Sequence, residues 1–101
     1  MKSLTSSQAK FLRGLAHNLK PVVFIGQKGI TTALLESIRE ALAVHELIKV
    51  RFIDSPDKRR RTDAVVEVQE KSESALAGMI GHVAIFYRPQ PDPAKRKIVL
   101  S

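Results

Sequence analysis

The sequence contains no cysteine, which excludes disulfide bonds, thiolate catalysis and zinc sites built from cysteine. It also lacks any apolar run close to the roughly 20 residues of a membrane-spanning helix, and its first residues are polar, unlike the centre of a signal peptide. We therefore expect a cytoplasmic globular protein without a membrane partner. At 101 residues, the chain is expected to form one domain with one core, residues 1–101.

Acidic residues are scarce and unevenly placed. The chain has 17 Lys and Arg residues against 10 Asp and Glu residues, a net charge of +7, and residues 1–35 contain no acid. Residues 36–73 are close to neutral, and residues 74–101 are basic again. Because each neutralised phosphate releases condensed counterions, this excess favours a polyanionic partner. The two basic ends form one surface only if the fold brings them together.

Capping residues and helical spacing predict a first helix between Thr5 and Pro21. Thr5 and Gln8 form a capping box, and Pro21 disfavours continuation beyond Lys20. One face of this helix is basic and has no acid to pair with, which leaves a binding surface and a merely solvated surface about equally open. The buried stripe is expected at Ala9, Leu12, Leu15, Ala16 and Leu19, and the basic stripe at Lys10, Arg13, His17 and Lys20.

Two further helices are predicted. Thr31 or Thr32 is expected to cap the second helix. The third covers residues 58–74, where the valines fit a strand as well as one helical face, but length and a capping signal favour a helix. Ser55 is expected to be its N-cap, with Pro56 in its first position.

The remaining apolar patterns predict strands. Residues 22–25 are an unbroken apolar run, typical of a strand buried on both faces. Residues 46–54 alternate, which places Lys49 and Arg51 on one partly wet, basic face. A closing hairpin is expected from residues 76–80 and 82–87. The order α-β-α-β-α-β-β predicts an α/β fold of the two-layer α+β type, with helices packed on a small mixed sheet.

The aromatic residues are few, and most of them are assigned to the core. Phe24, Phe52 and Phe86 occupy expected core positions, so a sheet platform for stacking bases is not expected. Tyr87 and Arg88 are the one aromatic–cation pair expected at an exposed strand end. The final segment, residues 89–101, is a proline-rich linker followed by basic residues that fit either a disordered tail or a last edge strand.

The most specific local motif is Gly26-Gln27-Lys28-Gly29, between a strand and a helix start. Backbone N–H groups at a helix N-terminus are unpaired, and glycines allow a phosphodiester backbone to approach them closely. This is the arrangement of the GXXG loop with which KH modules clamp nucleotide backbone. An ordinary tight turn explains the same four residues. The spacing is not that of a P-loop or of a GxGxxG dinucleotide site.

A second basic element is Lys58-Arg59-Arg60-Arg61, for which a solvated charge run and a phosphate contact remain equally open. The three histidines have no metal-binding spacing, and no nucleophile and base are paired. We therefore predict no catalytic residue, no metal site and no cofactor, and a protein that is not an enzyme.

Four ordered blocks resemble the CRM domain (chloroplast RNA splicing and ribosome maturation). They are residues 12–23 followed by Ile25-Gly26-Gln27-Lys28-Gly29, residues 45–50, residues 80–82 and residues 86–89. The resemblance is to the stand-alone bacterial, YhbY-type form of this family. It implies a four-stranded mixed sheet with three helices, similar to the C-terminal domain of translation initiation factor three. It also implies RNA binding through the GXXG loop and the neighbouring basic helix. Two features depart from the family pattern: the unusually basic run Lys58–Arg61, and Ala77 with Gly78 in the third strand.

The leading hypothesis is an RNA-binding domain that binds ribosomal RNA in precursors of the large ribosomal subunit and acts in ribosome assembly. The alternatives are a protein–protein interaction module that docks an acidic partner, with RNA binding incidental, and a general DNA binder. A monomer is favoured. The expected RNA-binding residues are Lys10, Arg13, Lys20, Gly26, Gln27, Lys28, Gly29, Thr31, Lys49 and Arg51, with further contacts at His17, Lys58, Arg59, Arg60, Arg61 and Arg88.

Overall fold

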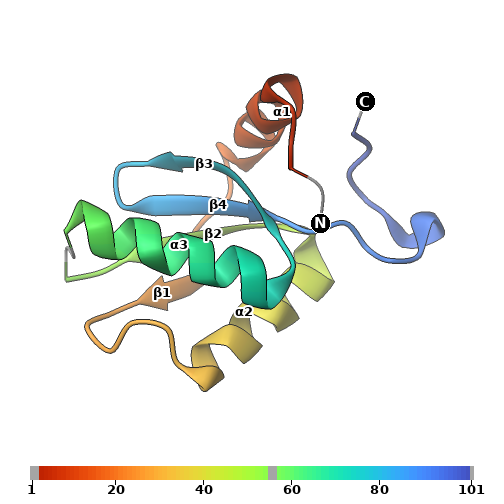
Figure 1. Cartoon of the computed structure of the whole chain (residues 1–101). Helices are drawn as coiled ribbons and strands as arrows, with labels where there is room; N and C mark the ends of the chain where they lie inside the picture. Colours follow the sequence, from red (N-terminus) through yellow and green to blue (C-terminus); the bar gives the residue numbers. More distant parts are fainter. Residues whose placement is uncertain (1–2, 55–56, 101) are drawn as a thin grey trace.

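The computed structural model describes residues 3–54 and 57–100, which form three α-helices, four strands and one short 3-10 helix (Figure 1). The expected order α-β-α-β-α-β-β and the four-stranded mixed sheet are confirmed. The elements are α1 (Ser6–Ala16), β1 (Val23–Ile25), α2 (Thr32–His45), β2 (Leu47–Phe52), α3 (Lys58–Ser72), β3 (Ala75–Ile80), β4 (Val83–Tyr87) and η1 (Pro93–Lys95).

The sheet has the strand order β1-β2-β4-β3. Strands β1 and β2 are parallel, and β4 pairs antiparallel with both β2 and β3. Since the carboxyl ends of parallel neighbours meet at the same edge of a sheet, the loops after β1 and β2 lie side by side. The GQKG loop follows β1, and the basic start of α3 follows β2, so the topology brings these two segments together (Figure 1).

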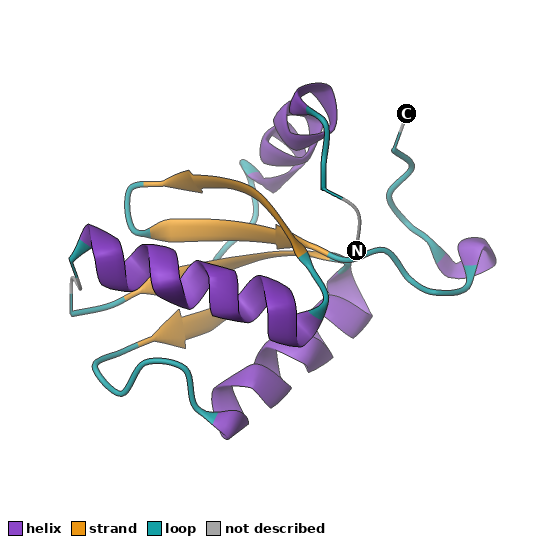
Figure 2. Ribbon diagram, in the orientation of Figure 1, coloured by secondary structure: helices purple, strands orange, loops and turns teal. Residues whose placement is uncertain are grey.

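The helices cover the two faces of the sheet unequally. Helices α2 and α3 pack on one face, and α1 packs on the other (Figure 2). The larger core cluster lies on the face of α2 and α3, and the smaller cluster lies under α1. The smaller cluster consists of Leu12, Ala16, Leu47, Ala77, Ile85 and Tyr87. As these residues come mainly from α1, β3 and β4, the same face remains open over β1.

Helix α1 is shorter than predicted. Its capping box forms as expected, but the helix ends at Ala16 rather than continuing to Lys20. The ammonium group of Lys49 on β2 donates to the carbonyl oxygens of His17 and Leu19, at 3.4 and 3.0 Å. These bonds satisfy carbonyl groups beyond the helix end, so the chain turns away toward β1. The expected basic stripe therefore does not lie on one helix, and Leu15 and Leu19 are exposed.

The other two helices begin at cap residues. The Thr31 side chain caps α2 by accepting from the Leu34 N–H at 3.1 Å. The N-cap of α3 is Asp57, whose carboxylate accepts from the Arg60 N–H at 2.8 Å. Ser55 and Pro56, the predicted cap and first residue of this helix, lie outside the described residues. The helical assignment of the valine-rich stretch is confirmed.

Strand β1 is not buried on both faces as predicted. It lies at the edge of the sheet, and the side chains of Val22 and Phe24 are 48 and 52 % exposed. Only Val23 and Ile25 enter the core. An apolar run of this length does not reveal whether a helix covers both of its faces, and here α1 lies too far toward β3 to cover β1.

The C-terminal segment is neither an edge strand nor a detached tail. The buried carboxylate of Glu46 accepts backbone N–H groups of Gln90, Lys97 and Ile98 at 2.9, 2.6 and 3.2 Å. Ile98 and Leu100 pack against the cluster under α1. The segment therefore returns to the end of the sheet opposite the GQKG loop (Figure 1).

Candidate nucleic-acid interface

The GQKG loop and the start of α3 border a pocket of about 340 Å³ at the carboxyl edge of β1 and β2. Helices α2 and α3 both begin at this edge, so two sets of unpaired N–H groups and two positive dipole ends lie near it. The lining residues are Ile25, Gly26, Gln27, Gly29, Phe52, Ile53, Asp54, Arg60 and Ala64.

The GQKG loop is a tight turn with an exposed tip. The N–H of Gly29 donates to the carbonyl oxygen of Gly26 at 3.0 Å, and Gly29 adopts a left-handed φ of +68°. Residues that carry a Cβ rarely adopt this left-handed conformation, because it brings the Cβ too close to the backbone. Gln27 and Lys28 are exposed at the tip, and Thr31 caps the helix that follows. The loop thus presents backbone and one ammonium group at a helix N-terminus.

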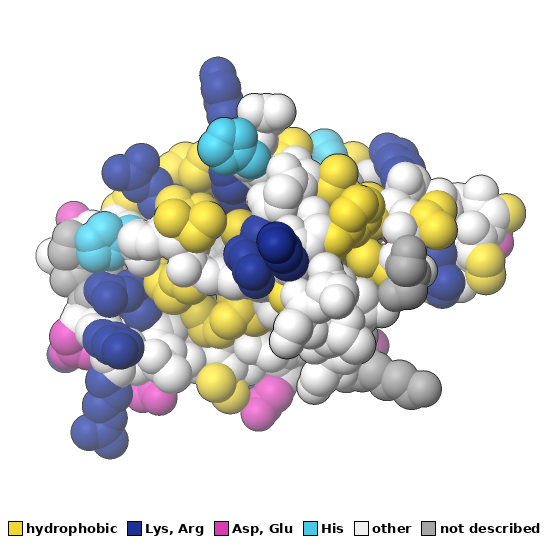
Figure 3. Space-filling view, turned by 90° about the horizontal axis from the view of Figure 1, so that it is seen from above, with side chains coloured by type: hydrophobic (Ala, Val, Ile, Leu, Met, Phe, Trp, Pro, Cys, Tyr) yellow, Lys and Arg dark blue, Asp and Glu magenta, His cyan; other side chains and the backbone are white. Residues whose placement is uncertain are grey.

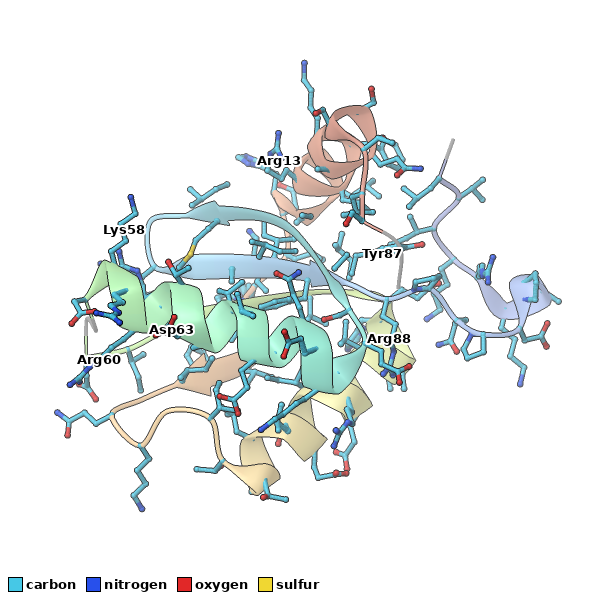
Figure 4. All side chains as sticks on the ribbon, in the orientation of Figure 1. Arg13, Lys58, Arg60, Asp63, Tyr87 and Arg88 are labelled. Carbon is cyan, nitrogen blue, oxygen red and sulfur yellow. The ribbon has the colours of Figure 1, made fainter. Side chains whose placement is uncertain are left out.

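The basic run Lys58–Arg61 lies at the same end of the molecule. Figure 4 shows Lys58 and Arg60 at the start of α3, and Arg60 lines the pocket together with the loop that follows β1. The nearest acid to the Arg60 guanidinium is Asp57, with an Nε–Oδ2 distance of 4.0 Å in a highly exposed pair that contributes little stability. Asp54 also lines the pocket. Its negative charge favours binding of phosphate on the loop side of the pocket rather than inside it.

The cations of α1 form a second part of the basic surface. Lys10 is exposed, whereas the Arg13 guanidinium donates to the Ala77 carbonyl oxygen at 2.9 Å. Seen from above, Lys and Arg side chains are interspersed with hydrophobic ones, and the visible Asp and Glu side chains lie near the outline (Figure 3). His17 and Lys20 are exposed beyond the helix end.

Like Arg13, two further predicted contacts, Lys49 and Arg88, have structural partners. Lys49 is held by the carbonyl groups after α1, although its strand neighbour Arg51 is exposed. Arg88 donates to the carbonyl oxygens of Ser72 and Arg39, at 2.9 and 3.3 Å. It lies at the opposite end of α3 from Lys58 (Figure 4). The basic ends of the sequence therefore do not merge into one surface.

Two aromatic residues lie differently from the sequence prediction. Tyr87 is only 2 % exposed, because it belongs to the cluster under α1 and is covered by the C-terminal segment, so the expected exposed Tyr87–Arg88 pair does not exist. Phe24, assigned to the core, is instead exposed beside Arg51, its register partner on β2. The alternating pattern of β2 could have indicated this exposure. It places Arg51 on a wet face of the sheet, and a side chain of the neighbouring strand at the same register lies on that same face.

The described residues carry neither a metal centre nor a membrane-spanning helix. Among residues 3–54 and 57–100, no cluster of three or more His, Asp or Glu side chains could hold a metal ion. No helix within these ranges is both long enough and apolar enough to cross a membrane.

The fold and the loop define a class of small α/β modules that carry a GXXG loop between an edge strand and a helix. The chain belongs to the CRS1 / YhbY (CRM) domain family, whose model matches residues 4–88. The match confirms the resemblance noted in the sequence, and it extends over most of the chain.

The chain is similar to curated proteins along nearly their whole length. It is 37 % identical over 92 residues to an RNA-binding protein of Haemophilus influenzae, covering 91 % of this chain and 92 % of that one. It is 37 % identical over 95 residues to a Pseudomonas aeruginosa protein named as a probable RNA-binding protein, covering 92 % of this chain and 88 % of that one. None of these names describes an enzyme, in agreement with the prediction.

A solved structure shares the fold. The solution structure of a hypothetical protein from Staphylococcus aureus superposes with a TM-score of 0.78 at 29 % sequence identity. The match covers 95 % of this chain and 99 % of that one, so the two proteins share the fold over nearly their whole length.

Proposed function

We propose that this protein binds RNA, and that the GQKG loop holds the RNA backbone at the N-terminus of α2. The observation that carries the proposal is the meeting of this loop with the basic start of α3 at one edge of the sheet. The names of the Haemophilus influenzae and Pseudomonas aeruginosa relatives support RNA as the polyanion.

Each part of the edge has a distinct role in this proposal. The loop N–H groups other than that of Gly29 donate to phosphate oxygens, and Lys28 adds a cation at the tip. Lys58, Arg59 and Arg60 neutralise further phosphates along the start of α3. Lys10 extends the track over α1, and Arg51 extends it over the sheet. Such contacts recognise backbone and shape rather than base sequence.

The RNA is proposed to be ribosomal RNA in precursors of the large ribosomal subunit, with the protein acting in ribosome assembly in the cytoplasm. This step rests on the family resemblance. Crosslinking in cells, mapping of the bound RNA and sedimentation of the protein with ribosomal particles test it. Crosslinks confined to messenger RNA, or sedimentation only as free protein, contradict it.

A salt titration tests the loop assignment. Lys28→Ala should weaken RNA binding and reduce the slope of log affinity against log salt by about one, because one phosphate contact is lost. Lys95→Ala is the matched control, since it removes the same charge from an exposed site on η1 at the other end. Filter binding over a range of salt concentrations measures both slopes. Equal slopes for wild type and Lys28→Ala exclude the contact.

A protein–protein module that docks an acidic partner is the second candidate. Helix α1 exposes Phe11 and Leu15 beside Lys10, around a shallow hollow. An apolar strip next to a cation suits a partner helix with acidic flanks. Phe11→Ser should abolish capture of such a partner but leave RNA affinity intact. Loss of RNA affinity in the same variant favours RNA as the ligand of this surface.

A further inference from the structure

One row of side chains crosses the open part of the sheet at the end next to the GQKG loop. The strand registers pair Phe24 with Arg51, Arg51 with Val83, and Val83 with Ile80. Register partners on neighbouring strands point to the same face, and neighbouring strands lie about 4.8 Å apart. The four side chains therefore form a row about 14 Å long across all four strands.

This row lies on the face of α1 but outside its cover. The outer members of the row are the most accessible, with Phe24 52 % exposed and Ile80 63 % exposed. Arg51 is exposed and Val83 is partly buried. An aromatic ring, a guanidinium group and two aliphatic side chains thus face solvent side by side.

The charge of this face of the sheet indicates what kind of ligand it can bind. The strands of the sheet contain no Asp or Glu residue within their bounds, Val23–Ile25, Leu47–Phe52, Ala75–Ile80 and Val83–Tyr87. Arg51 stands at the centre of the row, and its side chain forms no hydrogen bond or ion pair with the residues that the structure describes. A flat apolar surface with an embedded cation suits a nucleobase attached to a phosphate, because the base stacks on the ring and the cation meets the phosphate.

The row also continues the proposed path of the RNA. Phe24 precedes Gly26 by two residues, about 7 Å along the strand. A backbone held at the GQKG loop can therefore place an adjacent nucleotide over β1. The base must be unpaired, since in a duplex its faces are covered by neighbouring base pairs.

We propose that the row Phe24–Arg51–Val83–Ile80 is a platform for unpaired RNA bases, on which one base stacks against the Phe24 ring. This inference rests on the proposed RNA binding and adds the class of ligand: single-stranded RNA or an unpaired loop. It also reverses the expectation that the sheet offers no stacking surface.

The chain contains no tryptophan, so Phe24→Trp introduces a single fluorescent reporter at the platform. Titration with a mixed-sequence single-stranded RNA oligonucleotide should quench this fluorescence strongly, because the base stacks on the indole ring. The same oligonucleotide annealed to its complement should quench it much less. Val44→Trp is the control, since Val44 is 57 % exposed on the last turn of α2, away from the row.

Affinity provides a second, independent readout. Phe24→Ala should weaken binding of the single strand by about ten-fold while leaving the salt slope unchanged, since a stacking contact but no phosphate contact is lost. Phe24→Leu should bind the single strand nearly as weakly as Phe24→Ala does, because leucine keeps the apolar bulk without the aromatic face. Phe24→Tyr should bind like wild type. Val22→Ala, at the neighbouring exposed position, should change little, and thermal melts of each variant check the fold.

The outcomes separate the two proposals. If wild type does not bind RNA, the proposed function fails and the platform fails with it. If wild type binds RNA but Phe24→Trp is quenched no more than Val44→Trp, the platform alone is overturned. The same holds if Phe24→Leu binds as tightly as wild type, since the site is then merely apolar.

Discussion

Glycine is needed for different reasons at the two glycine positions of the GQKG loop. Gly29 has a left-handed φ of +68°, and a side chain there would meet open space. Gly26 has no such backbone conformation, and an added Cβ would lie at an ordinary 3.6 Å from Cδ1 of Ile53. The fold therefore requires glycine at position 29, whereas at position 26 only an approaching ligand would require it.

Substitution of these two residues distinguishes fold from binding. Gly26→Ala should leave the free energy of unfolding nearly unchanged but weaken RNA binding by about ten-fold, because the methyl group hinders charge-assisted hydrogen bonds to the phosphate. Gly29→Ala should in addition lower the free energy of unfolding by about 1–2 kcal/mol, because residue 29 has a left-handed backbone conformation. Urea denaturation and filter binding measure the two effects. Wild-type affinity in Gly26→Ala would mean that the RNA backbone does not approach this residue.

At the scale of elements, α1 is fixed to β3 by Arg13 and Gly78. The Arg13 side chain crosses Gly78 so closely that a Cβ there would lie 2.5 Å from its Cδ, and its guanidinium donates to Ala77. The register shift between Leu76 and Gly78 accompanies this crossing. The glycine that departs from the family pattern in the third strand is thus the residue that lets α1 dock on it.

The crossing predicts coupling between the two positions. Gly78→Ala should destabilise the wild-type protein by about 1–3 kcal/mol through overpacking. In the Arg13→Ala background the same change should be neutral or slightly stabilising, since the clash is gone and a flexible glycine is replaced. Urea denaturation of the four proteins gives the coupling. Additive effects would show that the Arg13 side chain moves aside at no cost.

Local chemistry made much of the fold predictable. The Thr5 capping box, the cap at Thr31 and the alternation of residues 46–54 are short-range signals, and the structure confirms each of them. The end of α1 was not predictable, because Lys49, which binds the carbonyl groups just beyond it, comes from a strand about 30 residues later. The exposure of Phe24 was missed because a short apolar run does not indicate whether its strand lies at the centre or at the edge of the sheet.

At the scale of the whole molecule, the candidate site depends on topology. The GQKG loop and Lys58–Arg61 are far apart in sequence and meet only because β1 and β2 are parallel neighbours. Each segment could be identified from its own residues. Their common edge could not, because the order of the strands is decided by packing across the whole sheet.

The far end of the molecule is held together by a buried carboxylate, and Tyr87 reports on it. Burial raises the pKa of the Tyr87 hydroxyl above its ordinary value of 10.0, the negative charge of Glu46 raises it further, and Arg96 lowers it. Because the folded state keeps this proton more tightly than the unfolded chain, the stabilisation is full below pH 10 and is lost as pH rises through the folded pKa. Stability should therefore fall on the alkaline side.

Glu46→Gln tests this arrangement, since it removes the charge that Tyr87 senses and weakens the acceptor for three backbone N–H groups. The pKa of Tyr87 should fall toward its ordinary value, and stability at neutral pH should drop by about 1–3 kcal/mol. Tyr87 is the only tyrosine and the chain has no tryptophan, so phenolate absorbance against pH follows this one group. Glu70→Gln, which removes an exposed charge from α3, should leave the titration unchanged. An identical Tyr87 titration in Glu46→Gln would mean that the Glu46 charge does not act on the hydroxyl, and unchanged stability would mean that its hydrogen bonds to the C-terminal segment contribute nothing.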